Sequence, residues 1–286
     1  MKSKTFLNAL SVSLFAAVLS VNIACSSQSK KELSPAQKKA KLFYNHGTRN
    51  LISQDYTQAL KNLKQAASLD PENSDIHNNL GMAYYFKKSE KKAELHIKKA
   101  VKLNPQNTDA KLNLASIHLK NNSLAEAERL YNNILEDLTY EGQHRTYYNL
   151  GVVALKRNNT ARAIENFNKS LEVSAGYCPA HFKLGELAYK KGRYSAAFKS
   201  YKEAGMGTCY ENPEPFLGQI ESLIKMNRFS DALVKLEDMQ ERFAMTKYEA
   251  LARRTMQKVK ALQAKKEDNA QVYSKKLDSS IQSLDF

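Results

Sequence analysis

The sequence predicts an all-α protein built as a solenoid of helical hairpins. Small residues recur with a period of about 34 residues, and an alanine stands twelve positions after each of them. Ten glycines and six prolines among 286 residues are too few for an all-β fold rich in turns, and the 42% hydrophobic content is sufficient for a core. Helical hairpins in series are therefore the expected architecture.

Residues 1–24 have the pattern of a signal peptide. Lys2 and Lys4 precede an apolar run from Phe6 to Val21, which matches the positive and hydrophobic regions of such a peptide. No later segment approaches the roughly 18 apolar residues that a membrane-spanning helix needs. The remainder of the chain is expected to be a periplasmic body.

The end of this run, Ala24-Cys25, resembles the lipobox of bacterial lipoproteins. The resemblance implies that Cys25 becomes the lipidated N-terminus and, because Ser26 rather than Asp follows it, that the protein is anchored in the outer membrane. Asn22 replaces the usual leucine. Secretion without a lipid and a retained membrane helix therefore remain alternatives. Residues 25–39, which include the polar sequence SSQSKKELSP, are expected to form the lipid anchor and a flexible tether.

The repeat defines the rest of the chain. The recurring small residues are Gly47, Gly81, Ala115, Gly151 and Gly185, with Ile220 in a degenerate last unit, and the alanines are Ala59, Ala93, Ala127, Ala163, Ala197 and Ala232. Because two helices approach closely only where side chains are small, we expect the two helices of each hairpin to cross at these pairs.

This pattern resembles the tetratricopeptide repeat, a helix-turn-helix unit that stacks into a superhelix. The resemblance implies a right-handed superhelical solenoid of about six repeats over residues 40–246, followed by a capping helix at 247–264 and a mobile tail at 265–286. The repeats are predicted at 40–73, 74–107, 108–143, 144–177, 178–212 and 213–246.

Enzyme signatures are missing from the sequence. It contains no glycine-rich phosphate loop, no H-E-x-x-H and no nucleophile motif, so we expect no catalytic residue and no cofactor. Cys178 and His181 are too few for a zinc site, and packing explains His77, His118 and His181 at recurring repeat positions. The excess of 44 Lys+Arg over 29 Asp+Glu could indicate nucleic acid, but a periplasmic location favours anionic lipid, cell-wall polymer or an acidic partner.

Cys178 and Cys209 are candidates for a disulfide. Cys178 begins the fifth repeat and Cys209 follows its second helix, so the two lie at the same open end of an antiparallel hairpin. The periplasm is oxidising. Two unpaired thiols remain the alternative.

A partner-binding groove is expected on the concave side of the superhelix. Positions 2, 6, 9 and 13 of each first helix face it, and position 6 is asparagine in four successive repeats. Since the hairpin core lies on other positions, we expect these asparagines to face solvent and to bind a peptide backbone. Solvent-tolerant surface residues are the alternative interpretation. The predicted groove residues are Asn45, Asn79, Asn113 and Asn149, the lysines Lys120, Lys156 and Lys190, and the apolar Met82, Tyr85, Phe86, Tyr148 and Phe182.

A lipidation cysteine, a short tether and six such repeats together resemble the pilotin family of type IV pilus assembly. The resemblance includes the enlarged junction LTYEGQHRTYYNLG at residues 138–151. It implies a non-catalytic, lipid-anchored protein that binds a secretin subunit, or another pilus assembly protein, and carries it to the outer membrane. The alternatives are an adaptor for cell-wall enzymes or proteases and a subunit of an outer-membrane protein assembly complex.

Overall fold

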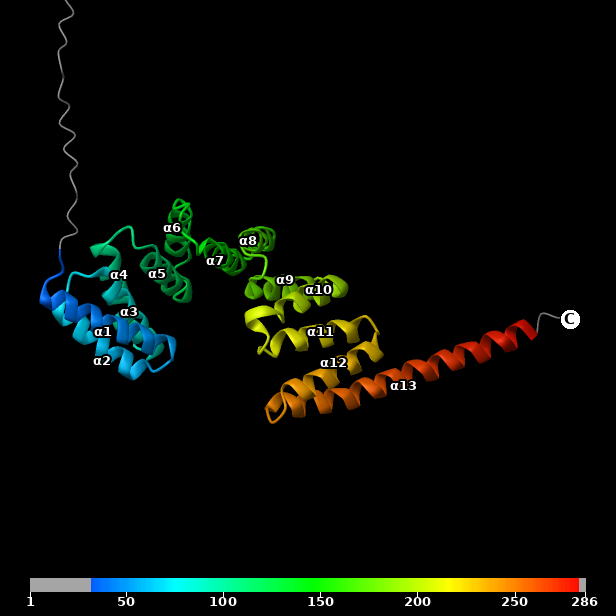
Figure 1. Cartoon of the computed structure of the whole chain (residues 1–286). Helices are drawn as coiled ribbons and strands as arrows, with labels where there is room; N and C mark the ends of the chain where they lie inside the picture. The colour runs from blue at the N-terminus through cyan, green and yellow to red at the C-terminus, as the bar shows by residue number, and fades with distance from the viewer. Residues whose placement is uncertain (1–31, 283–286) are drawn as a thin grey trace, which may run out of the picture.

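The computed structural model describes residues 32–282, and this part of the chain contains thirteen α-helices, one short 3-10 turn and no strand (Figure 1). The helices are α1 (Pro35–Ile52), α2 (Tyr56–Leu69), α3 (Ser74–Phe86), α4 (Glu90–Leu103), α5 (Thr108–Lys120), α6 (Leu124–Leu135), α7 (Gln143–Lys156), α8 (Thr160–Val173), α9 (Cys178–Lys190), α10 (Tyr194–Ala204), η1 (Gly207–Cys209), α11 (Glu214–Lys225), α12 (Phe229–Arg242) and α13 (Lys247–Gln282). The predicted signal peptide and Cys25 lie outside the described residues. The predicted all-α solenoid of six hairpins is confirmed.

The turn inside each hairpin has one residue in the left-handed backbone region. This residue occupies the same place in all six repeats: Gln54, Lys88, Asn122, Asn158, Gly192 and Asn227, with φ between 56° and 71°. Asparagine and glycine adopt this conformation at the least cost, and they hold four of the six positions. The shared conformation makes each turn tight and its two helices antiparallel.

The repeat glycine of four first helices lies beneath a large side chain of the second helix: Gly47, Gly81, Gly151 and Gly185. A Cβ added to Gly81 would lie 2.4 Å from a side-chain carbon of Ile97, and one added to Gly47 would lie 2.5 Å from Leu63. The alanine twelve positions on lies beside this contact, since the Ala93 carbonyl would be 3.1 Å from the Gly81 Cβ. The small pair therefore leaves room for a buried side chain sixteen positions after the glycine.

Buried side chains form clusters that run through the repeats. The largest extends from Ala59 in the first hairpin to Val153 in the fourth, and all the clusters lie between Ala40 and Val259. The repeat region therefore carries its own core. No helix among residues 32–282 is both long and apolar enough to cross a membrane.

The predicted tether is wrong over its last five residues, because α1 begins at Pro35 rather than near residue 40. The Ser34 hydroxyl accepts a hydrogen bond from the Gln37 backbone N–H at 3.2 Å, and the Gln37 side chain accepts one from the Ser34 N–H at 3.1 Å. This capping box, with proline as the first helical residue, starts the helix.

The predicted boundary at residue 264 is also wrong, since α13 continues as one helix to Gln282. Its first part caps the array as expected, with Ala252 and Val259 buried against the last hairpin. The helix then projects beyond the hairpins (Figure 1). Residues 247–282 contain no glycine or proline and many helix-favouring residues, so nothing in the local sequence stops the helix.

Candidate partner-binding groove

A groove of about 370 Å³ crosses the first helices of repeats 1 to 4. Its lining comes from α1, α3, α5 and α7: Thr48, Leu51, Ile52, Asn78, Asn79, Met82, Phe86, Asp109, Leu112, Asn113 and Arg145. Most of these residues occupy repeat positions 2, 6, 9 or 13, the positions that the sequence assigns to the concave face. The structure thus brings together Asn79, Met82, Phe86 and Asn113 from the predicted set.

Exposed apolar side chains form one edge of this groove. Ile52 is 79% exposed, and Phe86 is 40% exposed and stacks on Tyr56 with the ring centroids 4.7 Å apart. Of the other apolar lining residues, Leu112 is buried and Met82 is partly buried. A protein partner with apolar side chains would remove this surface from water, a favourable contribution to binding.

The asparagines of the groove form a hydrogen-bonded network. The Asn113 amide donates to the Asn78 carbonyl oxygen at 2.9 Å, and the Asn78 amide donates to that of Asn79 at 3.3 Å. The Asn79 amide donates to the Thr48 hydroxyl at 2.8 Å. The network therefore joins α5, α3 and α1.

The expectation that Asn79 and Asn113 have no packing role and face solvent is therefore wrong. Both side chains are half-buried and hold adjacent repeats together. Replacing them with alanine would leave partly buried polar groups unpaired and lower stability as well as any binding. The exposed Ile52 is a better position at which to test the groove.

The enlarged junction before repeat 4 supports the far end of the groove. Tyr140, from this junction, donates a hydrogen bond to the Asp109 carboxylate at 3.1 Å and accepts one from Arg145 at 2.9 Å. Burial raises the pKa of Tyr140 to about 12, so the hydroxyl remains protonated and able to donate. Asp109 and Arg145 are thereby held 3.6 Å apart at the groove end.

The predicted groove residues of repeats 1 to 3 that lie outside this groove have other surroundings. Asn45 lines a separate hollow of about 170 Å³ with Tyr44 and Asp75. The Lys120 ammonium pairs with Glu90 and lies 4.9 Å from the Tyr85 ring centroid. The positive charge of Lys120, one of the three predicted groove lysines, is therefore paired with a carboxylate.

The predicted groove residues of repeats 4 and 5 do not line the groove. The Tyr148 ring packs against Phe167 and Tyr177, with centroids 5.6 Å away in both cases. Phe182 packs against Tyr201 at 5.6 Å. Asn149 is half-buried, and two lysines are exposed: Lys156 and Lys190.

Four functional candidates were missed by reasoning from the sequence, although the signal for them was present. Thr48 and Ile52 hold positions 9 and 13 of the first repeat, and Asp109 and Arg145 hold position 2 of the third and fourth. Applying the same positions to every repeat, and not only to the asparagines, would have found them.

Three of the histidines make contacts within the repeats: His77, His96 and His181. The Nε2 atoms of His77 and His181 lie 2.9 Å from the carbonyl oxygens of Pro71 and Ala175, six residues earlier in each case. His77 also contacts His96, with 3.1 Å between their Nδ1 atoms, and burial lowers the pKa of His96 to about 4. Residues 32–282 contain no group of three or more His, Cys, Asp or Glu side chains placed so that they could hold a metal ion.

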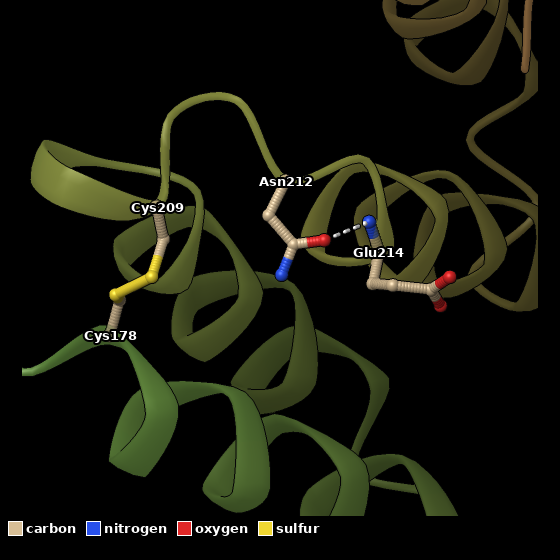
Figure 2. Close-up of a disulfide and its surroundings, with 4 residues drawn as sticks. All are labelled: Cys178, Cys209, Asn212 and Glu214. Carbon is tan, nitrogen blue, oxygen red and sulfur yellow. Dashed lines mark hydrogen bonds between the residues drawn. A yellow bond between two sulfur atoms is a disulfide. The ribbon is translucent and has the colours of Figure 1, made fainter. Parts of the chain in front are cut away.

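Cys178 and Cys209 are joined by a disulfide in the structure, with their Cα atoms 6.3 Å apart (Figure 2). The bond connects the start of α9 to the η1 turn. Just beyond it, the Asn212 side-chain oxygen accepts a hydrogen bond from the backbone N–H of Glu214, the first residue of α11, at 3.1 Å (Figure 2). The disulfide thus fixes the junction between repeats 5 and 6.

A larger hollow of about 790 Å³ lies between α4 and the α5–α6 hairpin. Its lining mixes charges of both signs, including Lys98, Arg129, Glu136 and Asp137, and Lys111 there donates a hydrogen bond to Asn133 at 2.9 Å. It lacks the exposed apolar edge of the groove, so the groove is the better candidate for binding a protein.

Family models for repeats match much of the chain. The model described as "TPR repeat" matches residues 51–87, and models described as "Tetratricopeptide repeat" match residues 74–107, 108–176 and 147–207. Together they cover residues 51–207 without a gap, which is more than half of the chain.

The sequence is similar to one curated protein involved in pilus assembly. It is 24% identical over 144 residues to the type IV pilus assembly protein PilF of Pseudomonas aeruginosa. The match covers 50% of this chain and 57% of PilF, so it spans little more than half of that relative.

Solved structures share the fold. That of Pseudomonas aeruginosa PilF has a TM-score of 0.64 at 21% identity and covers 80% of this chain and 99% of its own. PilW, a type IV pilus biogenesis factor, has a TM-score of 0.64 at 19% identity, with 77% and 97% covered. The Cut9–Hcn1 complex also reaches 0.64, at 16% identity, with 78% and 43% covered. The six hairpins and the repeat matches together show that the chain belongs to the tetratricopeptide-repeat family.

Proposed function

We propose that this protein is a pilotin of type IV pilus assembly. In this proposal a lipid on Cys25 holds the chain at the outer membrane, and the groove across repeats 1 to 4 binds a secretin subunit in the periplasm. The protein is then a non-catalytic scaffold that delivers its partner to the membrane in which the partner assembles.

The observation that carries the proposal is the groove itself. It combines an exposed apolar edge at Ile52 and Phe86 with a charged end at Asp109 and Arg145. Such a surface suits a protein segment that presents apolar side chains and a polar or charged end. The similarity to PilF makes a pilus protein the preferred partner.

The groove residues are held in place before any partner arrives. The amide network fixes α1, α3 and α5 relative to one another, and Tyr140 holds Asp109 and Arg145. A preformed surface loses less conformational entropy on binding than a mobile one. The apolar contacts with the partner would then provide the affinity, and the lipid on Cys25 would bring the bound partner to the outer membrane.

The proposal predicts that Cys25→Ser separates the protein from the outer membrane. In cells, wild-type protein should fractionate with the outer membrane, and the secretin should appear there as an assembled ring. The Cys25→Ser protein should be found in the soluble or inner-membrane fraction, and the amount of assembled secretin should fall at least tenfold.

Mass spectrometry of the mature N-terminus provides the control, since wild-type Cys25 should carry acyl chains. Two results would contradict the proposal. Fractionation of Cys25→Ser with the outer membrane, without an acyl mass on the wild type, would exclude the anchor. Normal secretin assembly in a strain that lacks the whole protein would exclude the pilotin role.

A further inference from the structure

The outer face of α4 is strongly basic. At about 100° per residue, all five lysines of this helix fall within roughly 60° of Leu95 on the helical circumference. These lysines are Lys91, Lys92, Lys98, Lys99 and Lys102. The opposite side, with Ala93, Ile97 and Ala100, is buried in the repeat core.

Leu95, at the centre of these lysines, is 65% exposed. The two acidic residues of the helix, Glu90 and Glu94, lie away from the centre of the face. Glu90 pairs with Lys120 of α5, and Glu94 pairs with Lys98 at 2.6 Å. Lys99 pairs with Glu72 of the α2–α3 turn at 3.8 Å, so two of the five lysines are in ion pairs. The other three have no carboxylate within 4 Å among residues 32–282, and they leave an excess of positive charge around an exposed apolar side chain: Lys91, Lys92 and Lys102.

The neighbouring helix α2 extends the basic face. It contains Lys61 and Lys64 and no acidic residue. The Lys64 and Lys92 ammonium groups approach the same Tyr84 ring, at 5.8 and 5.6 Å from its centroid. Within residues 32–282, neither ammonium has a carboxylate within 4 Å. The lysines of both helices thus form one surface, which we call the α2–α4 basic face.

This face lies at the end of the array where the chain enters it. Leu33 and Gln37 line a hollow with Asp70 and Asn73, which places the start of α1 beside the α2–α3 turn. The Ser74 hydroxyl donates to the Ala100 carbonyl at 2.8 Å, so the lysine-rich end of α4 is adjacent to that turn. Nine residues, 26–34, separate Cys25 from α1 and can reach at most about 30 Å.

We propose that the α2–α4 basic face docks on an anionic phospholipid bilayer and orients the repeat array against the membrane. The lysines would lie near the lipid phosphates and Leu95 would enter the head-group region. Juxtamembrane lysines are attracted by anionic lipids, and one exposed apolar side chain adds to the attraction. A lipid on Cys25 would keep the face within reach of the bilayer, but the charge arrangement is independent of that lipid.

The test uses residues 25–286 with Cys25→Ser. This chain contains every hydrophobic cluster and cannot carry a lipid at residue 25. Partitioning is measured by co-sedimentation with phosphatidylcholine vesicles and with vesicles in which about one third of the lipid is phosphatidylglycerol. We expect binding only to the anionic vesicles, weakening as salt rises from about 0.02 to about 0.3 M.

The variant Lys91→Gln/Lys92→Gln/Lys102→Gln should reduce partitioning on the order of 100-fold. A matched control, Lys156→Gln/Lys190→Gln/Lys225→Gln, removes the same charge from exposed lysines on other repeats and should reduce it less than about threefold. All six lysines are exposed, so both variants should fold, which circular dichroism checks.

Three outcomes would overturn the inference. These are equal binding of the wild type to both kinds of vesicle, equal loss in the two lysine variants, and binding to polyglutamate without binding to anionic vesicles. The last result would indicate an acidic protein or polymer as the ligand. Because the tested chain has no lipid and no secretin is present, failure here leaves the pilotin proposal untouched.

Discussion

Gly151→Val should lower the free energy of unfolding by about 2–4 kcal/mol. A Cβ on Gly151 would lie 2.5 Å from the Phe167 ring, and Phe167 is fully buried in the fourth hairpin. Because the ring is fully buried, it can move away from the added side chain only by displacing its neighbours or by separating α7 from α8. Urea or thermal denaturation of the purified variant measures the loss.

Gly176→Ala is the matched control for this substitution. No atom lies within 4 Å of the position that its Cβ would take, so its stability should stay within about 0.5 kcal/mol of the wild type. If Gly151→Val is as stable as Gly176→Ala, close helix crossing at the repeat glycines does not hold the hairpin together.

Loss of the Cys178–Cys209 disulfide should cost about 3–4 kcal/mol. The bond closes a chain segment with a sequence separation of 31, and the chain-entropy estimate for a loop of this length has that magnitude. The double variant Cys178→Ser/Cys209→Ser should therefore unfold at a lower denaturant concentration than the oxidised protein, and the reduced wild type should resemble the variant.

Thiol alkylation of the denatured, unreduced mature protein checks the bond itself. Neither Cys178 nor Cys209 should be labelled before reduction, and both should be labelled after it. Full labelling of both without reductant would mean that the two thiols are unpaired in the cell.

The repeat register could be predicted from the sequence because each hairpin has the same local requirements. A small residue with an alanine twelve positions later, as at Gly81 and Ala93, indicates a close helix crossing in each repeat. The second helix of the hairpin then follows a turn of fixed conformation. Such requirements depend on residues close together in the chain. For this reason the predicted starts of repeats 2 to 6 lie within one residue of the starts of α3, α5, α7, α9 and α11.

The ends of the array were harder to predict because a repeat pattern has no information about them. The signal that starts α1 is the pair Ser34 and Gln37, which lies outside the repeat. The continuation of α13 past residue 264 depends on local helix propensity, whereas the prediction relied on packing against a neighbour.

The repeat positions that line the groove could be predicted from the sequence, but the hydrogen bonds between the groove residues could not. Asn79 and Asn113 both hold position 6 of their repeats. Their hydrogen-bond partners hold different positions, since Thr48 is at position 9 and Asn78 at position 5. Similarly, Tyr140 supports Asp109 from 31 residues away through an enlarged junction. Contacts between repeats depend on the side chains at several positions together, so a periodic pattern alone does not specify them.

The groove as the partner-binding surface is tested most directly by one pair of substitutions, Ile52→Asp and Val234→Asp. Both residues are exposed aliphatic side chains on helices, 79% and 63% exposed, but Ile52 lines the groove and Val234 lies on α12, away from it. Binding of each purified variant to a purified type IV pilus secretin subunit is measured at equilibrium, with thermal melting as the check on folding. The account predicts that Ile52→Asp weakens binding at least tenfold, a change of about 1.4 kcal/mol or more, while Val234→Asp binds as the wild type does. Equal binding by both variants and the wild type would contradict it.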